Sequence, residues 1–296
     1  MIVLVFLAQT LRIVVPYLLA AAGGVMSERV GVIALSLEGF MLTGAFTAAV
    51  GSYFTHTPWV GLVCGLLGGL ALALVYALAA VRFRADQVVV GVALNLLAVG
   101  VTRFFLRFAF DSSSNSPRVP GFGGAHAGSA ALGSLLDTLG DPLVWIGLLT
   151  VPAIGWLLYD TPFGLRARAV GEKPEAATSL GVSVGRVRVL GVALSGMLAG
   201  LAGAYLALDQ HQFTDGMTAG RGFIALAAVI FGRWDPKRVA GACVLFAAAE
   251  TLQIQLQGAQ VIPSQFVEMI PYLLTIVALA GVVGRATPPA ALGKAE

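Results

Sequence analysis

Long apolar blocks separated by short polar segments run along almost the whole chain, a pattern typical of membrane-spanning helices. A helix needs about 17–25 apolar residues to cross the hydrocarbon core of a bilayer. The pattern predicts an all-α polytopic membrane protein with about nine spans, at residues 2–22, 30–53, 59–81, 87–110, 143–159, 187–208, 220–232, 239–256 and 269–284. The segment 220–232 is too short for a straight crossing, so we interpret it as a broken or re-entrant helix that lines a cavity.

One polar and basic segment interrupts these blocks at residues 161–188, with the sequence TPFGLRARAVGEKPEAATSLGVSVGRVR. Pro174 suits a first helical turn and Gly181 suits a position just past a helix end, so the residues between them should form about two turns. So short a helix is marginal alone in water. Two interpretations are open. The helix docks on a partner that Ala176 and Ala177 allow to approach closely, or the segment is a solvated cytoplasmic loop.

Basic residues alternate between the loops in a way that predicts the orientation of the chain. By the positive-inside rule, the loops rich in Arg and Lys face the cytoplasm. The opposite loops hold hardly any basic residue except Arg118, and we interpret the longest of them, 111–142, as a flexible spacer. Nine crossings then place Met1 outside and Glu296 inside. Besides the segment 161–188, the residues assigned to the cytoplasmic side are Arg82, Arg84, Arg233, Lys237, Arg238, Arg285 and Lys294.

Composition supports this class and excludes others. Of the 296 residues, 58% are hydrophobic and 11% are charged, whereas soluble domains carry roughly 25% charged residues. The first charge is Arg12, so the N-terminus lacks the basic stretch of a signal peptide and predicts a retained first span. The net charge of +3 follows from basic loops, and we expect no nucleic acid as a partner. Cys64 and Cys243 lie in apolar blocks, which predicts neither a disulfide nor a metal site.

Polar residues inside the predicted spans are candidates for a substrate pathway, because such residues are costly in a bilayer and usually face a bundle interior or a wet cavity. Glu250 and Gln253 lie three residues apart, on one helical face. For Glu38 and Glu250 the alternatives are a pathway wall or gate and a structural hydrogen bond between packed helices. We expect Arg12 and Arg103 to snorkel or to pair with these carboxylates. The pathway candidates are Ser36, Glu38, Asn95, Glu250 and Gln253.

Two repeated patterns bear on how the spans pack. Among 37 glycines, successive GxxxG steps such as Gly196 with Gly200 predict close contacts between helices; Gly61, Gly65 and Gly69 form two more steps. The sequence GVIAL at 31–35 also recurs as GFIAL at 222–226, in a span of opposite direction. This echo predicts inverted repeats of four helices, and such repeats place the substrate path at their interface.

Enzyme classes find little support in the sequence. It contains no GxxxxGK[ST], HExxH or GxSxG motif. Ser195 precedes Gly196 as an intramembrane protease nucleophile might, but His56, His126 and His211 all fall in predicted loops. A Ser–His pair is therefore not expected, and we predict a chain that is not an enzyme.

Several segments resemble the permease subunits of bacterial nucleoside-type ABC importers, within a larger group that includes simple-sugar and branched-chain amino-acid permeases. The first is SERVGVIALSLEGFMLTGAF at 27–46. The others are AVGEKPEAATSLGVSVGRVRVLGVALSGMLAGLAGAYLAL at 169–208, TAGRGFIALAAVIFGRWDP at 218–236, IPSQFVEMIPYLLTIVALAG at 262–281 and PAALGK at 289–294. Together they cover most of the chain outside 111–142.

The resemblance implies a single permease domain over residues 1–296, similar to type II ABC importers, in the bacterial cytoplasmic (inner) membrane. Its parts are a first repeat at 1–110, a linking helix at 143–160, a cytoplasmic coupling loop at 161–186 and a second repeat at 187–285. The implied partners are a second permease subunit, an ATP-binding cassette ATPase, a substrate-binding lipoprotein and membrane lipid. This chain would need no cofactor, because ATP and Mg bind the partner ATPase.

The resemblance also implies roles for single residues. Those that match the coupling motif would lie in a groove of the ATPase and transmit its closure to the sixth span, so Ala177→Asp should abolish assembly or coupling. The leading function is ATP-driven uptake of nucleosides. The alternatives are uptake of a simple sugar such as ribose and a proton-coupled carrier that uses Glu38 or Glu250. The coupling residues are Gly171, Glu172, Pro174, Ala176, Ala177 and Gly181.

Overall fold

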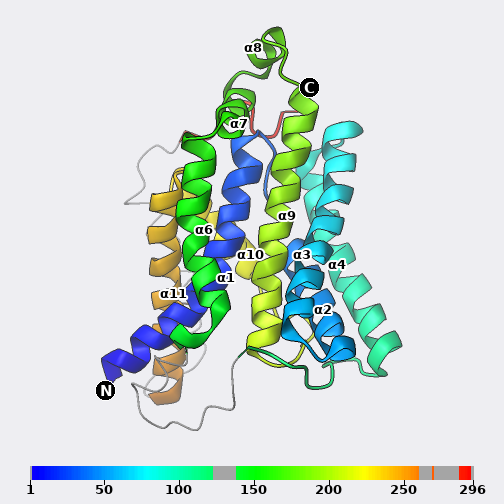
Figure 1. Cartoon of the computed structure of the whole chain (residues 1–296), viewed down its shortest axis with the longest axis vertical. Coiled ribbons are helices and arrows are strands. Elements are labelled where there is room, and N and C mark those ends of the chain that lie inside the picture. The colour runs from blue at the N-terminus through cyan, green and yellow to red at the C-terminus, as the bar shows by residue number, and fades with distance from the viewer. Residues whose placement is uncertain (1, 123–137, 260–268, 270–286, 295–296) are drawn as a thin grey trace.

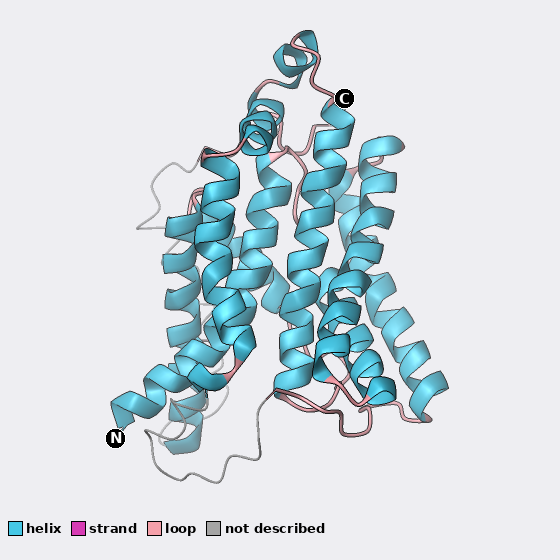
Figure 2. Cartoon of the chain, in the orientation of Figure 1, coloured by secondary structure: helices cyan, strands magenta, loops and turns pink. Residues whose placement is uncertain are grey.

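Long helices packed side by side form the described part of the chain (Figures 1 and 2). The structure is a computed structural model, which describes residues 2–122, 138–259, 269 and 287–294. Within these ranges the regular elements are all helices, apart from one isolated bridge between Asn115 and Thr214. The predicted all-α class is therefore confirmed for these ranges. The predicted span at 269–284 lies outside the described residues, except for Met269.

Six described helices are long and apolar enough to cross a membrane. These are α1 (Ile2–Arg29), α3 (Pro58–Ala77) with its π-helical continuation η1 (Leu78–Arg82), α4 (Gln87–Phe110), α6 (Pro142–Tyr159), α9 (Val184–Asp209) and α11 (Pro236–Ala259). The helix α2 (Leu37–Thr55) has 19 residues but is less apolar. The helix α10 (Arg221–Phe231) has 11 residues, too few for a straight crossing, as its sequence predicts. Two short helices, α7 (Pro162–Glu172) and α8 (Pro174–Ser179), follow α6.

The predicted span at 30–53 is wrong over residues 30–36, which are not helical. Gly31 has a φ of 88°, in the left-handed region that glycine tolerates without strain. The N–H of Gly31 donates to the Glu28 carbonyl at 3.0 Å and that of Val32 to the Ser27 carbonyl at 3.0 Å. This is the Schellman pattern that ends a helix. The apolar pattern hid the break, because the non-helical residues are themselves apolar.

The helix α9 lies at the core of the bundle, in contact with α1, α2 and α3 (Figure 1). Glycines allow these backbones to touch. A Cβ atom placed on Gly69 would lie 2.2 Å from the Gly196 carbonyl oxygen, and one on Gly44 would lie 2.4 Å from that of Gly200. The close contacts predicted from the GxxxG steps are thus confirmed, and they lie within one chain.

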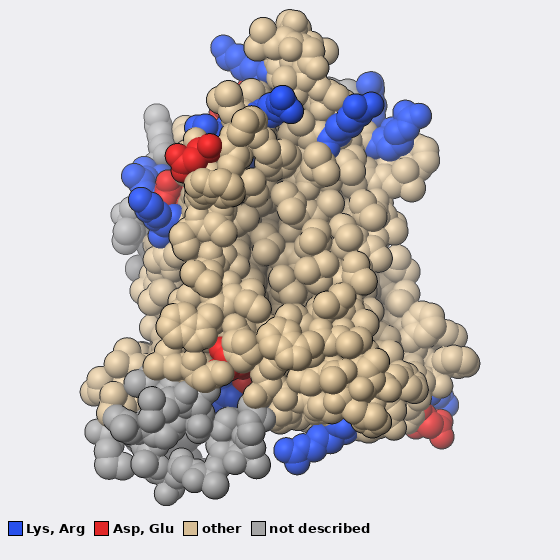
Figure 3. Space-filling view, viewed as in Figure 1, with Lys and Arg blue, Asp and Glu red and all other residues tan. Residues whose placement is uncertain are grey.

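Lys and Arg side chains gather at the end of the molecule that carries α7 and α8 (Figure 3). The N-terminus lies at the opposite end (Figure 1). The basic loops therefore share one end of the bundle, as their alternation along the sequence predicts. By the positive-inside rule this end faces the cytoplasm, and we call it the cytoplasmic end below.

The predicted spacer at 111–142 is wrong in its first part. The N–H of Ser116 donates to the Phe213 carbonyl and that of Val119 to the His211 carbonyl, both at 2.8 Å. Residues 114–119 thus pair through their backbone with the chain that follows α9. Residues 123–137 lie outside the described part.

We predict that Gly203→Ala lowers the melting temperature of the detergent-solubilised protein. The new Cβ atom would lie 1.8 Å from the Met41 carbonyl oxygen, so α2 and α9 must move apart, and overpacking of this kind costs about 1–3 kcal/mol. Gly185→Ala in the same helix is the matched control. Its Cβ atom meets nothing within 4 Å, and alanine favours helix. Equal melting temperatures for the two variants would contradict the close packing of α9.

Candidate functional site

Most of the residues singled out by the sequence fall in or beside two regions. One is a polar junction inside the bundle, formed by residues 30–39 and 217–222. The other is a helical hairpin at the cytoplasmic end, formed by α7 and α8 (Figure 1).

The non-helical backbone of the junction is satisfied first by side chains at the end of α1. The Ser27 hydroxyl donates to the Val32 carbonyl at 2.9 Å. The Glu28 carboxylate accepts from the Ala34 N–H at 3.2 Å and also from the indole N–H of Trp234. Glu28 is 2% exposed. An unpaired backbone group in the interior of a bilayer costs several kcal/mol, so such partners permit a broken helix there.

Helices α3 and α4 satisfy the rest of this segment. The Tyr76 hydroxyl donates to the Ile33 carbonyl at 2.8 Å, and the Gln87 side chain accepts from the Ile33 N–H at 2.8 Å. Asn95 donates through Nδ2 to the Leu35 carbonyl at 2.9 Å. Sequence reasoning missed Glu28, Tyr76 and Gln87. The available signal was a carboxylate three residues before Gly31, but Glu28 lies between the predicted spans 2–22 and 30–53.

Glu38 joins the N-termini of α2 and α10. Its Oε1 atom accepts from the Thr218 hydroxyl at 2.6 Å and from the Gly220 N–H at 2.9 Å. Its Oε2 atom accepts from the Gly222 N–H at 2.7 Å. The first N–H groups of a helix lack intrahelical partners and carry partial positive charge, so a carboxylate is well placed there. In this structure Glu38 forms hydrogen bonds between packed helices.

Asn95, on α4, and Ser36 both lie at the start of α2. Asn95 accepts from the Gly39 N–H at 2.8 Å in addition to its bond to Leu35. A Cβ atom on Gly39 would lie 2.9 Å from this oxygen, so a larger residue there would push against the Asn95 amide. Ser36 is fully buried, and its hydroxyl has no hydrogen-bond partner among the described residues.

Glu250 links three helices rather than lying in open space. It accepts from Arg221 Nη2 at 2.8 Å and from the hydroxyl of Tyr17. Arg221 is held further by the Met217 carbonyl, at 3.1 Å from Nη1. The side chains of Arg221 and Glu250 are 22% and 17% exposed. Gln253 is half-buried and makes no hydrogen bond to a residue that the structure describes.

Of the two alternatives for Arg12 and Arg103, pairing with Glu38 or Glu250 is wrong. Arg12 pairs with Asp209 at 2.5 Å, and Arg103 pairs with Asp215 at 2.7 Å. The two arginine side chains are 42% and 60% exposed. Such exposed pairs contribute about 0–1 kcal/mol.

The short sequence echo does not mark equivalent structures. Residues 31–35 are non-helical, whereas residues 222–226 lie in α10. Ser195, the other residue weighed for chemistry, is fully buried, and its hydroxyl has no partner among the described residues.

The hairpin ends on the helix cap that the sequence predicts. Gly181 has a φ of 79°. Its N–H donates to the Thr178 carbonyl at 2.9 Å, and the Val182 N–H donates to the Ala177 carbonyl at 3.0 Å. This is again the Schellman pattern. It ends α8 where the positions of Pro174 and Gly181 in the sequence predict its end.

Only part of the predicted coupling motif is available to a partner. Gly171, Pro174 and Ala177 are buried within this chain, whereas Glu172, Ala176 and Gly181 are exposed. Ala177 is 3% exposed, so Ala177→Asp would disturb the packing of α8 itself. The sequence analysis missed Leu180, which is 84% exposed at the end of α8. Because Leu180 is exposed, its substitution tests docking more directly than substitution of the buried Ala177.

The hairpin is tied to the junction through close backbone contacts. A Cβ atom on Gly171 would lie 2.2 Å from the Arg29 carbonyl oxygen. The segment 287–294 lies across both parts, because the Ala291 N–H donates to the Gly171 carbonyl at 2.9 Å and the Gly293 N–H to the Gly31 carbonyl at 3.2 Å. The end of α7 and the non-helical segment after α1 are therefore both bonded to the segment 287–294.

Comparison with known proteins points to one family. A family model described as branched-chain amino acid transport system / permease component matches residues 6–279. The guanosine ABC transporter permease protein NupQ of Bacillus subtilis is 38% identical, over 98% of this chain and 95% of that protein. The nucleoside ABC transporter permease protein NupC of Lactococcus lactis is 35% identical, over 98% of this chain and 95% of that protein.

A solved structure shares the fold. It is described as an inward-facing conformation of a putative metal-chelate type ABC transporter, with a TM-score of 0.54 and 16% sequence identity. The match covers 93% of this chain and 86% of that one. At this identity the likeness shows the fold alone.

We predict that Asn95→Leu lowers the melting temperature of the purified protein. The change leaves the Leu35 carbonyl and the Gly39 N–H without a partner, and each buried group left unpaired costs about 1–3 kcal/mol. Gln253→Leu is the matched control. Gln253 is also an amide in a span, but it makes no hydrogen bond to a described residue, so we expect a change within about 0.5 kcal/mol. Similar melting of both variants would contradict the role assigned to Asn95.

Proposed function

The chain belongs to the family of branched-chain amino acid transport system permease components, and we propose that it is the membrane-spanning subunit of an ATP-driven importer of nucleosides. One observation carries this proposal: two permeases named for guanosine and for nucleosides match 98% of the chain at 38% and 35% identity. The chain itself has no phosphate-binding GxxxxGK[ST] loop. The energy of transport therefore comes from a partner ATPase that binds ATP and Mg.

The hairpin of α7 and α8 is the surface that suits this ATPase. It projects from the cytoplasmic end of the bundle (Figure 1). At its tip Ala176 is exposed and Leu180 is 84% exposed, so a partner groove could bury both. The hairpin is linked to α1 through the contact of Gly171 in α7 with the Arg29 carbonyl. A movement imposed on α8 would thus reach the junction directly.

The substrate path runs, in this proposal, along the half-exposed side of the junction. Glu38 and Asn95 keep part of their surface exposed while holding the helix starts in place. Phe223, next to the Gly222 that Glu38 holds, is 46% exposed. Stacking of a base on an aromatic side chain is worth about 1–3 kcal/mol in single-stranded nucleic acid complexes, and Phe223 offers a nucleobase such a face. Ser36 is buried and lies behind this wall.

The path requires a second permease subunit to close it and a substrate-binding lipoprotein to load it from outside. Inverted repeats would place it at an interface of this kind. Two features of the chain favour such repeats, although the sequence echo does not. Both α2 and α10 follow a long helix, α1 or α9, after a non-helical segment, and Glu38 lies in the first turn of α2 and accepts hydrogen bonds from the start of α10. The long helices run in opposite directions (Figure 1).

Uptake of labelled guanosine and uridine by cells tests the proposed function. We expect uptake to be lost when this chain is deleted and to be restored by the chain together with its ATPase. Free ribose in excess should not compete. Competition by ribose would favour the sugar alternative. Uptake that persists without the ATPase but collapses with the proton gradient would favour a secondary carrier and contradict the proposal.

We predict that Leu180→Asp reduces co-purification of the ATPase and nucleoside uptake by about tenfold or more, because a charge would be buried in the docking groove. The chain itself should stay folded, since Leu180 packs little within it. Thr57→Asp adds the same charge at an exposed position of the opposite end and should change neither quantity. Normal co-purification of the ATPase with Leu180→Asp would exclude the tip of α8 as the docking site.

A further inference from the structure

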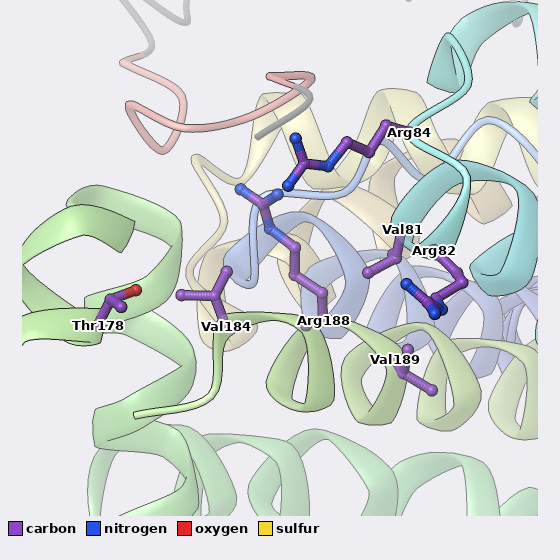
Figure 4. Close-up of a pocket in the computed structure, with 8 residues that line it drawn as sticks. Val81, Arg82, Arg84, Thr178, Val184, Arg188 and Val189 are labelled. Atoms are coloured by element: carbon purple, nitrogen blue, oxygen red, sulfur yellow. The ribbon is translucent and has the colours of Figure 1, made fainter. Parts of the chain in front are cut away.

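A hollow of about 410 Å³ opens at the cytoplasmic end, beside the start of α9 and the turn that follows η1 (Figure 4). Most of its wall comes from the ends of membrane-spanning helices, and α8 contributes Thr178. The residues that line it are Val81, Arg82, Arg84, Thr178, Val184, Gly185, Arg188 and Val189.

The charge in this hollow is of one sign. Three arginines and no acidic residue line it among the described residues. Figure 4 shows the guanidinium groups of Arg84 and Arg188 close to one another. Arg188 is 5% exposed and donates to the Lys294 carbonyl at 3.4 Å. An anion bound in the hollow would be stabilised by charge-assisted hydrogen bonds from arginine side chains.

Two of the arginines have donors to spare. Arg82 and Arg84 are exposed and make no hydrogen bond or ion pair within the described part of the chain. The nearest carboxylate in the sequence, Asp86, already accepts from the N–H groups of Val88 and Val89 at 2.9 Å and so caps α4. The planar guanidinium of arginine suits a phosphate, which it can bind through two parallel N–H groups.

Exposed apolar side chains lie close in the sequence to the residues that line the hollow. Phe83 lies between the two free arginines in the sequence and is 72% exposed, Val89 is 66% exposed and Leu190 on α9 is 52% exposed. A phosphate bound here would therefore have apolar surface beside it at the level of the cytoplasmic leaflet. This combination fits a phospholipid, whose headgroup needs basic residues and whose chains need apolar ones.

We propose that this hollow binds the phosphate of an anionic phospholipid from the cytoplasmic leaflet. The bound headgroup bridges the turn between η1 and α4 to the start of α9 and to Thr178 of α8. It thereby holds α8 against the bundle. An acidic segment of a protein partner suits the hollow less well, because helix ends at membrane level build most of its wall. This lipid site does not rest on the identity of the transported substrate.

Native mass spectrometry of the full importer complex tests the site. The complex is released from nanodiscs that contain equal parts of phosphatidylglycerol and phosphatidylcholine. We expect the wild type to retain phosphatidylglycerol in preference to phosphatidylcholine. Its affinity should fall about tenfold in the double variant Arg82→Gln, Arg84→Gln. The double variant Arg82→Lys, Arg84→Lys keeps the charge and should retain most of the binding.

The matched control is Arg107→Gln with Arg118→Gln, which removes the same charge from exposed arginines near the opposite end and should leave retention unchanged. Equal retention by the wild type and by Arg82→Gln, Arg84→Gln would overturn the proposal. So would displacement of the lipid by inorganic phosphate at equal concentration. The double variant Arg82→Gln, Arg84→Gln could also lose the ATPase, and to the same extent in nanodiscs of phosphatidylcholine alone as in nanodiscs that contain phosphatidylglycerol. That result would assign the hollow to a protein partner instead.

Discussion

The need to satisfy every backbone polar group inside a membrane is the constraint on which this structure depends. Helices satisfy it by themselves, but residues 30–36, between α1 and α2, are not helical. Five side chains from three helices replace the missing bonds. Glu38 does the same for the start of α10. The polar residues inside the bundle therefore fix the starts of α2 and α10.

Glycine packing makes this network possible. Contacts such as Gly203 against the Met41 carbonyl bring α9 and α2 to backbone distance. Larger residues would hold the helices further apart, and side-chain bonds of 2.7–2.9 Å such as those of Glu38 and Asn95 would no longer reach. In a bilayer, where lipid is as apolar as leucine, such close packing is also a main source of helix association. The same glycines thus support both the fold and the polar junction.

The hairpin and the junction form one continuous set of contacts. Gly171 touches the last carbonyl of α1, and Gly31, just beyond it, accepts a hydrogen bond from Gly293. The segment 287–294 therefore lies between the surface proposed for the ATPase and the break proposed to border the substrate path. The arrangement offers a short physical route between the two. The basic hollow lies beside it and shares Thr178 of α8 and the start of α9.

The sequence by itself determined the all-α class, the placement of most described helices, the cytoplasmic end, the small helix α8 and the family. These follow from local chemistry: apolar length, the sign of loop charges, and a proline and a glycine around a polar turn. The same chemistry at Gly31 went unrecognised, since its apolar neighbours looked like a continuing span. Only the tertiary structure decided the partners of Glu38, Asn95 and Glu250, the burial of Ala177 and the exposure of Leu180. Those depend on side chains that lie up to 233 positions apart in the chain, and no local pattern specifies which of them meet.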